Sequence, residues 1–155
     1  MGGNNINLEE LPHILDLMSR ALVHDIGKVR IPAEIINKPG ILTEDEWKVV
    51  KRHPVEGLAF LLRRWGISRE TARMFPAVLE HHLGMSFSGY PEFMRRKAPG
   101  FLARIIHIAD FYDAVTTPRV YNKSPFSPVE VVRVSDQSPW EIGLDPTQVT
   151  LTLSE

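Results

Sequence analysis

Four histidines and two aspartates of this chain are spaced so that their side chains could hold metal ions. Each lies at or near the end of an expected helix or on its inner face. Successive positions are about one helical hairpin apart, so antiparallel packing would bring them together. Imidazoles and carboxylates in these numbers suit one or two first-row metals with open positions for water. The six residues are His24, Asp25, His53, His81, His82 and Asp110.

The adjacent pair His24-Asp25 is the anchor of this set. Neighbouring residues on a helix do not share a face, so we expect the helix to end at the pair and the backbone to turn there. Gly27 would permit this turn because glycine adopts unusual backbone dihedral angles at little cost. Lys28 would then stand where it could contact a phosphate oxygen beside the metal.

Each candidate ligand also has a simpler interpretation. His53 precedes a proline and could be a helix cap or a surface residue. The pair His81-His82 could be exposed at a helix end, and Asp110 could cap a neighbouring helix. These interpretations weaken when all of them must hold together, so a shared metal site is the favoured hypothesis.

Two further histidines do not fit the set. His13 would lie about three helical turns before His24 on the same helix, roughly 16 Å away, which is too far to share a site. His107 precedes Asp110 by three residues and faces a similar direction. We expect His107 to be a packed or rim histidine, with a supporting role beside the ligands as the lesser alternative.

The composition restricts the chemistry. The chain has 155 residues, 43% hydrophobic and 24% charged, which suits one globular domain with a sizeable core. A net charge of −1 predicts no bulk nucleic-acid binding. Cysteine is absent, so thiolate sites are excluded and the metal would be Fe, Mn, Zn or Mg. No apolar run suits a membrane span and no leader is recognised, which predicts a cytoplasmic protein without membrane contact.

Apolar periodicity and capping signals predict an all-α fold. Thr43 and Glu46 form a capping box, Gly66 ends one helix, and Ser68 caps the next. Helices are predicted over 8–25, 44–51, 55–65, 69–82 and 101–117. An ordered loop or a short turn of helix is predicted over 31–42, and a loop over 84–99. The buried face predicted for the last helix consists of Leu102, Ile105, Ile106, Ala109 and Tyr112.

The sequence signals for secondary structure are weaker after residue 118. Ser127-Pro128 is typical of a helix start, but the valines that follow are β-branched and weaken this prediction. Residues 149–153 alternate like a strand. We divide the chain into a loose N-terminal segment (1–7), a domain (8–148) and a C-terminal tail (149–155).

Over about residues 5–148 the sequence resembles the HD-GYP branch of the HD-domain phosphohydrolases. Members of that family are helical bundles that bind two or three metals and hydrolyse cyclic dinucleotides, chiefly cyclic di-GMP. The shared motifs are HDIGK at 24–28, IP at 31–32, NKPGILT at 37–43, KRHP at 51–54, HH at 81–82, SGYP at 88–91, ARI at 103–105 and ADFYDAVT at 109–116.

The resemblance implies a role for each matching residue. It makes the six residues of the first paragraph ligands of two or three divalent metals, with Fe or Mn foremost. Lys28 would contact the scissile phosphate, and Asp113 would orient Lys28, so that both act with Asp25 in catalysis. Tyr90 and Arg119 would help to bind the dinucleotide.

Departures from the family pattern add further expectations. Family members carry another histidine on a helix before the His-Asp pair, and we expect this first ligand-bearing helix to be lacking. At 83–87, Leu-Gly-Met-Ser-Phe replaces a charged, Trp-containing segment. A fragment of a larger regulatory protein, or a shortened paralogue, is therefore expected. The apolar face left open predicts self-association, and regulatory or cyclase domains are the expected protein partners.

Three functions stay open at this point. The first is a metal-dependent cyclic di-GMP phosphodiesterase of bacterial second-messenger signalling, which hydrolyses a phosphodiester with metal-activated water. The second is a catalytically impaired sensor or protein-interaction module that keeps the fold. The third is a phosphohydrolase acting on another nucleotide, because a fold does not fix the substrate. Lys28, which lies beside so many candidate metal ligands, favours the phosphodiesterase.

Overall fold

The computed structural model describes residues 11–117, and within this range the chain is helical. The predicted all-α fold is confirmed there, and the one β-type contact is an isolated bridge between Leu83 and Gly89. The α-helices are α1 (Leu11–Leu22), α2 (Ala33–Ile36), α3 (Glu44–Val50), α4 (His53–Trp65), α5 (Arg69–Glu80) and α6 (Phe101–Thr116). Two short 3-10 helices are η1 (Ile26–Arg30) and η2 (Glu92–Met94).

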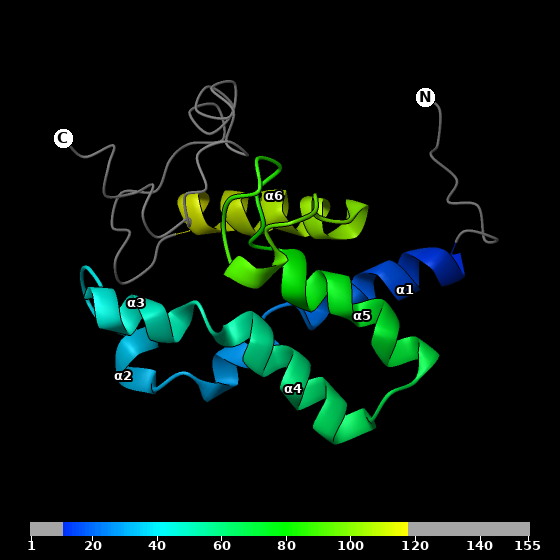
Figure 1. Cartoon of the computed structure of the whole chain (residues 1–155), viewed down its shortest axis with the longest axis horizontal. Coiled ribbons are helices and arrows are strands. Elements are labelled where there is room, and N and C mark those ends of the chain that lie inside the picture. The colour runs from blue at the N-terminus through cyan, green and yellow to red at the C-terminus, as the bar shows by residue number, and fades with distance from the viewer. Residues whose placement is uncertain (1–10, 118–155) are drawn as a thin grey trace, which may run out of the picture.

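Helices α4 and α5 form a hairpin, and α5 lies between α4 and α6 (Figure 1). The segment η1 packs on α4, whereas α6 and α1 both pack on α5. Helices α2 and α3 lie at the opposite end of the molecule from α1 (Figure 1). Among residues 11–117, no helix combines the length and the apolar character that a membrane span requires.

Several helix ends follow the predicted signals. Thr43 and Glu46 make the reciprocal capping box of α3, and Ser68 makes a second capping box with Thr71 at the start of α5. Gly66 ends α4 with a φ of +68°, a value that favours glycine.

Three predicted helix boundaries were wrong. Helix α1 ends at Leu22, before the His-Asp pair, α4 begins at His53 rather than at Val55, and α5 ends at Glu80, before the His-His pair. Proline in the first turn of a helix loses no helical hydrogen bond, so α4 can begin one residue before it. His53 therefore belongs to the first turn of a helix whose position is fixed by packing.

The predicted role of Gly27 as a flexible turn residue was also wrong. Its φ is not positive, unlike those of Gly40, Gly66 and Gly89. Instead, η1 approaches α4 so closely that a Cβ on Gly27 would lie 1.8 Å from the carbonyl oxygen of His53. Glycine is needed here because the two backbones leave no space for a side chain.

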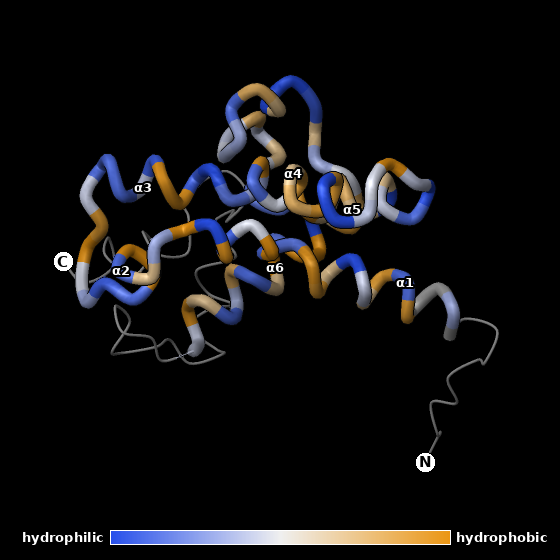
Figure 2. Tube along the Cα trace, turned by 90° about the horizontal axis from the view of Figure 1, so that it is seen from below, coloured by the Kyte–Doolittle hydropathy of each residue, from blue (hydrophilic) through white to orange (hydrophobic). Residues whose placement is uncertain are grey.

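The predicted buried face of α6 was only partly right. Ile106 is buried, but Ile105 and Tyr112 are 45% and 43% exposed, and the buried residues also include Ala103, Ala114 and Val115. Helix α6 carries apolar residues around its circumference, so hydrophobic spacing alone does not select one face. Figure 2 shows apolar segments along α6 as well as in the α4–α5 hairpin.

Replacing Gly27 with alanine tests the close approach of η1 and α4. Because the new methyl group would collide with backbone atoms, we expect Gly27→Ala to lower the free energy of unfolding by about 3 kcal/mol, measured by urea denaturation. The control is Gly66→Ala, where nothing lies within 4 Å and only the backbone conformation (φ +68°, ψ −166°) is penalised, by about 2 kcal/mol. An equal or smaller loss for Gly27→Ala would contradict the packing argument.

Candidate metal centre

The candidate ligands come from four separate elements that meet at one point. His24 and Asp25 lie in the turn between α1 and η1, and His53 is the first residue of α4. His81 and His82 directly follow α5, whereas the sixth candidate lies on α6. His53 and His81 are fully buried and His82 is 7% exposed, so the simpler interpretation of these three as surface residues is excluded.

Backbone carbonyls fix the orientation of three of the histidine rings. In each case the ring Nδ1–H donates to a carbonyl oxygen three or four residues earlier in the chain, which leaves Nε2 as a lone-pair donor to a metal. The bonds run from His24 to Ala21 (2.6 Å), from His53 to Val50 (2.9 Å) and from His81 to Ala77 (2.9 Å).

The Nε2 atoms then converge on one carboxylate. The Nε2 atoms of His53 and His81 are 3.1 Å apart, and Asp25 Oδ1 lies 3.3 Å from the first and 3.7 Å from the second. With Nδ1 protonated on both rings, all three atoms are acceptors that cannot bond to one another. A divalent cation between them would remove this repulsion, so the donor set fits a metal.

Asp25 belongs to two groups of donor atoms. One group joins Asp25 to His53, His81 and His82, and the second joins Asp25 to His24 and Asp110. Within each group the donor atoms lie within 4.8 Å of one another. Asp25 therefore lies between two positions, each of which could hold one cation.

Unsatisfied buried atoms support the same conclusion. Among the described residues, four buried side-chain atoms have no hydrogen-bond partner, namely Arg20 Nε, His24 Nε2, Asp25 Oδ1 and His82 Nε2. Leaving a polar atom in this state costs about 1–3 kcal/mol, so such atoms are rare unless another group binds them. Three of these four atoms belong to residues of the two donor groups.

The charges at the centre also suit metal binding. Burial acts to raise the pKa of the Asp25 carboxyl, but the adjacent rings of His24 and His53 and the charge of Lys28 hold that pKa far below its usual range. Burial and neighbouring imidazoles hold the pKa values of His81 and His82 well below the ordinary histidine value. The result is an ionised carboxylate beside neutral imidazoles, which are the forms that bind metals.

The pKa of His24 is shifted in the opposite direction, upwards. Burial acts to lower the pKa of His24, but the adjacent Asp25 carboxylate outweighs burial and raises that pKa above the ordinary value. Its ring is held edge-on to that of His81, with centroids 5.0 Å apart.

The remaining predicted site residues occupy different surroundings. Lys28 Nζ donates to Asp25 Oδ2 over 2.6 Å. Tyr90 is buried, and its ring stacks on His82 with centroids 4.5 Å apart. Asp113 accepts a hydrogen bond from the Thr117 hydroxyl group. Arg119 lies outside the described residues.

Two supporting residues were missed or underrated by sequence reasoning. Glu80 is buried, and its two carboxylate oxygens accept from the Gly100 backbone N–H (2.8 Å) and the Lys97 ammonium (2.6 Å). These bonds fix the start of α6 against the end of α5. His107 Nδ1–H donates to the His81 carbonyl over 2.7 Å, so the lesser alternative of a supporting role agrees with its position.

The family follows from comparison with known proteins. Residues 5–130 match the family model described as the HD domain, and the chain therefore belongs to the HD-domain family.

Individual relatives are cyclic-dinucleotide phosphodiesterases. A cyclic di-GMP phosphodiesterase of Pseudomonas aeruginosa is 37% identical over 125 residues, covering 81% of this chain and 29% of the relative. A cyclic di-GMP phosphodiesterase response regulator of Xanthomonas campestris pv. campestris is 33% identical, covering 79% of this chain and 36% of the relative. A 3'3'-cGAMP-specific phosphodiesterase of Vibrio cholerae is 38% identical, covering 66% of this chain and 23% of the relative. The chain thus spans a quarter to about a third of the length of these relatives.

Metal binding should stabilise the fold. Starting from protein treated with a chelator, we expect Mn²⁺ at 100 times its dissociation constant to raise the free energy of unfolding by about 2.7 kcal/mol. Asp25→Asn should lose most of this gain because Asp25 belongs to both donor groups. The matched control Asp45→Asn, on the exposed face of α3, should keep it. A response of Asp25→Asn equal to that of the control would refute this site.

Proposed function

We propose that this domain is the catalytic part of a metal-dependent phosphodiesterase, and that its substrate is a cyclic dinucleotide, with cyclic di-GMP first. The observation that carries the proposal is the meeting of His53 Nε2, His81 Nε2 and Asp25 Oδ1 within 3.7 Å of one another. A lysine ammonium, that of Lys28, lies 2.6 Å from the same carboxylate. A structural metal site has no evident need for this cation.

The chain's own residues would divide the work between holding metals and holding phosphate. Divalent metals bound by the two donor groups would supply Lewis-acid chemistry, polarising phosphoryl oxygens and acidifying water. Lys28 has a side chain that is 36% exposed, so its ammonium can reach a phosphate oxygen and offset charge that develops there. Asp25 would orient Lys28 while its other oxygen faces the imidazoles.

The buried histidines would keep the centre rigid. His53 and His81 are enclosed by protein and fixed by carbonyl bonds, so their Nε2 atoms need little rearrangement when substrate arrives. The stacking of Tyr90 on His82 suits a role in fixing that ring. Contact of Tyr90 and Arg119 with the dinucleotide, and orientation of Lys28 by Asp113, remain predictions from the family resemblance.

A second substrate is supported by one relative. The Vibrio cholerae phosphodiesterase that is 38% identical over 107 residues is named as specific for 3'3'-cGAMP. This molecule shares the cyclic dinucleotide backbone, so the same metal and lysine arrangement could act on it. The choice between the two would depend on groups that contact the bases.

Hydrolysis by the full chain loaded with Mn²⁺ tests the proposal. We expect cyclic di-GMP to be converted to linear dinucleotide or mononucleotide, with 3'3'-cGAMP assayed in parallel by chromatography. Lys28→Met should lower kcat by about 100-fold or more, because a cation that stabilises transition-state charge is lost. The Mn²⁺ content of the variant should stay that of the wild type.

The matched control is Lys48→Met, which removes an exposed lysine from α3. Its kcat should equal that of the wild type. If metal-loaded wild-type protein turns over neither dinucleotide, the enzymatic proposal is wrong, and retained binding of cyclic di-GMP would support a sensor instead. If Lys28→Met is as active as Lys48→Met, the role of Lys28 is wrong.

A further inference from the structure

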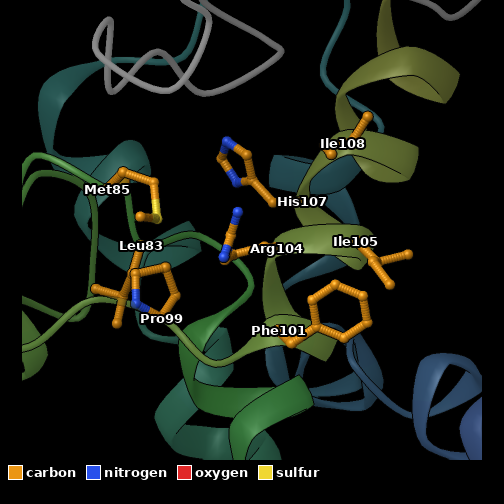
Figure 3. Close-up of a pocket in the computed structure, with 9 residues that line it drawn as sticks. Leu83, Met85, Pro99, Phe101, Arg104, Ile105, His107 and Ile108 are labelled. Carbon is orange, nitrogen blue, oxygen red and sulfur yellow. The ribbon is translucent and has the colours of Figure 1, made fainter.

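A pocket of about 420 Å³ lies between the first half of α6 and the loop that follows α5. Small-molecule sites in proteins usually have volumes of about 300–1,000 Å³ and mostly apolar walls. The loop contributes Leu83 and Met85, and α6 contributes Phe101, Ile105 and Ile108 (Figure 3). The walls thus provide an aromatic ring, a thioether and branched aliphatic groups.

Two polar side chains of α6, Arg104 and His107, also line the pocket (Figure 3). His107 is held in place because its Nδ1–H donates to the His81 carbonyl over 2.7 Å. Within residues 11–117, the structure pairs the Arg104 guanidinium with no carboxylate, and no acidic residue lines the pocket. Among the described residues that line the pocket, there is thus one permanent positive charge and no negative one.

We propose that this pocket binds a small aromatic carboxylate. A guanidinium presents a planar fork of donors that matches a carboxylate, whereas a flat ring suits the surfaces of Met85 and Phe101. A single permanent cation matches a monoanion. A ligand with several phosphates would leave negative charge without a partner in the pocket.

The proposal is independent of the phosphodiesterase chemistry. None of the nine residues that line the pocket is a candidate metal ligand, and the ligand needs no metal. His107 connects the two regions through the backbone of His81, and Leu83 directly follows the candidate ligand His82. A failure of this proposal would leave the function of the metal centre untouched.

Calorimetric titration of the full chain with 2-naphthoate tests the site. We expect saturable binding of one molecule per chain. The neutral isostere 2-naphthamide should bind about three- to tenfold more weakly, since one partly exposed ion pair is lost. Arg104→Met should lower the affinity for 2-naphthoate by the same factor and leave the affinity for 2-naphthamide unchanged.

A charge placed in the apolar wall provides a second variant. Ile108→Asp should weaken 2-naphthoate more than tenfold, because the new carboxylate repels the ligand. Ile108 is 45% exposed, so the substitution should not prevent folding. The matched control Ile67→Asp, at a position that is 86% exposed between α4 and α5, should bind as the wild type does.

Three results would overturn the proposal. The first is no saturable binding of 2-naphthoate to the wild type. The second is equal affinity for acid and amide, or an Arg104→Met variant that binds both as before. The third is equal weakening by Ile108→Asp and Ile67→Asp, which would mean general adsorption to apolar surface.

Discussion

Three backbone carbonyls accept hydrogen bonds from the Nδ1–H groups of His24, His53 and His81, and the metal centre depends on these bonds. They determine which ring nitrogen carries the proton, and thus point the Nε2 lone pairs at Asp25. If no cation were bound, rotating one imidazole ring would relieve the contact between acceptor atoms. The domain instead keeps acceptors 3.1–3.7 Å apart in its core, which is a cost that a bound metal would repay.

Close backbone approach brings these rings together. Gly27 allows η1 to reach the start of α4, and Gly57 lies on the α4 side of the same contact. Gly89 does the same for the loop after α5, since a Cβ there would lie 1.9 Å from the His82 carbonyl oxygen. The following N–H, that of Tyr90, donates to this oxygen over 3.2 Å. This backbone contact places the Tyr90 ring against the imidazole of His82.

Much of this arrangement could be predicted from the sequence, for identifiable reasons. The helices carry strong local signals, such as the Thr43 and Ser68 caps, and the HD-GYP resemblance brought the six candidate ligands into one set. The features that the sequence did not predict are determined by packing between segments distant in sequence. Local signals could not reveal that Gly27 faces a carbonyl, that Glu80 binds the Gly100 N–H before α6 or which face of α6 is buried. The Glu-His-His sequence at 80–82 and the glycines at 27 and 57 were the available clues.

The most direct test is anomalous diffraction from crystals of the chain grown with Mn²⁺. The account predicts a manganese peak within bonding distance of the Nε2 atoms of His53 and His81 and of an Asp25 carboxylate oxygen. The Nδ1 atoms should still donate to their backbone carbonyls. A peak bonded through Nδ1, or no peak while the rings hydrogen-bond to one another, would contradict it.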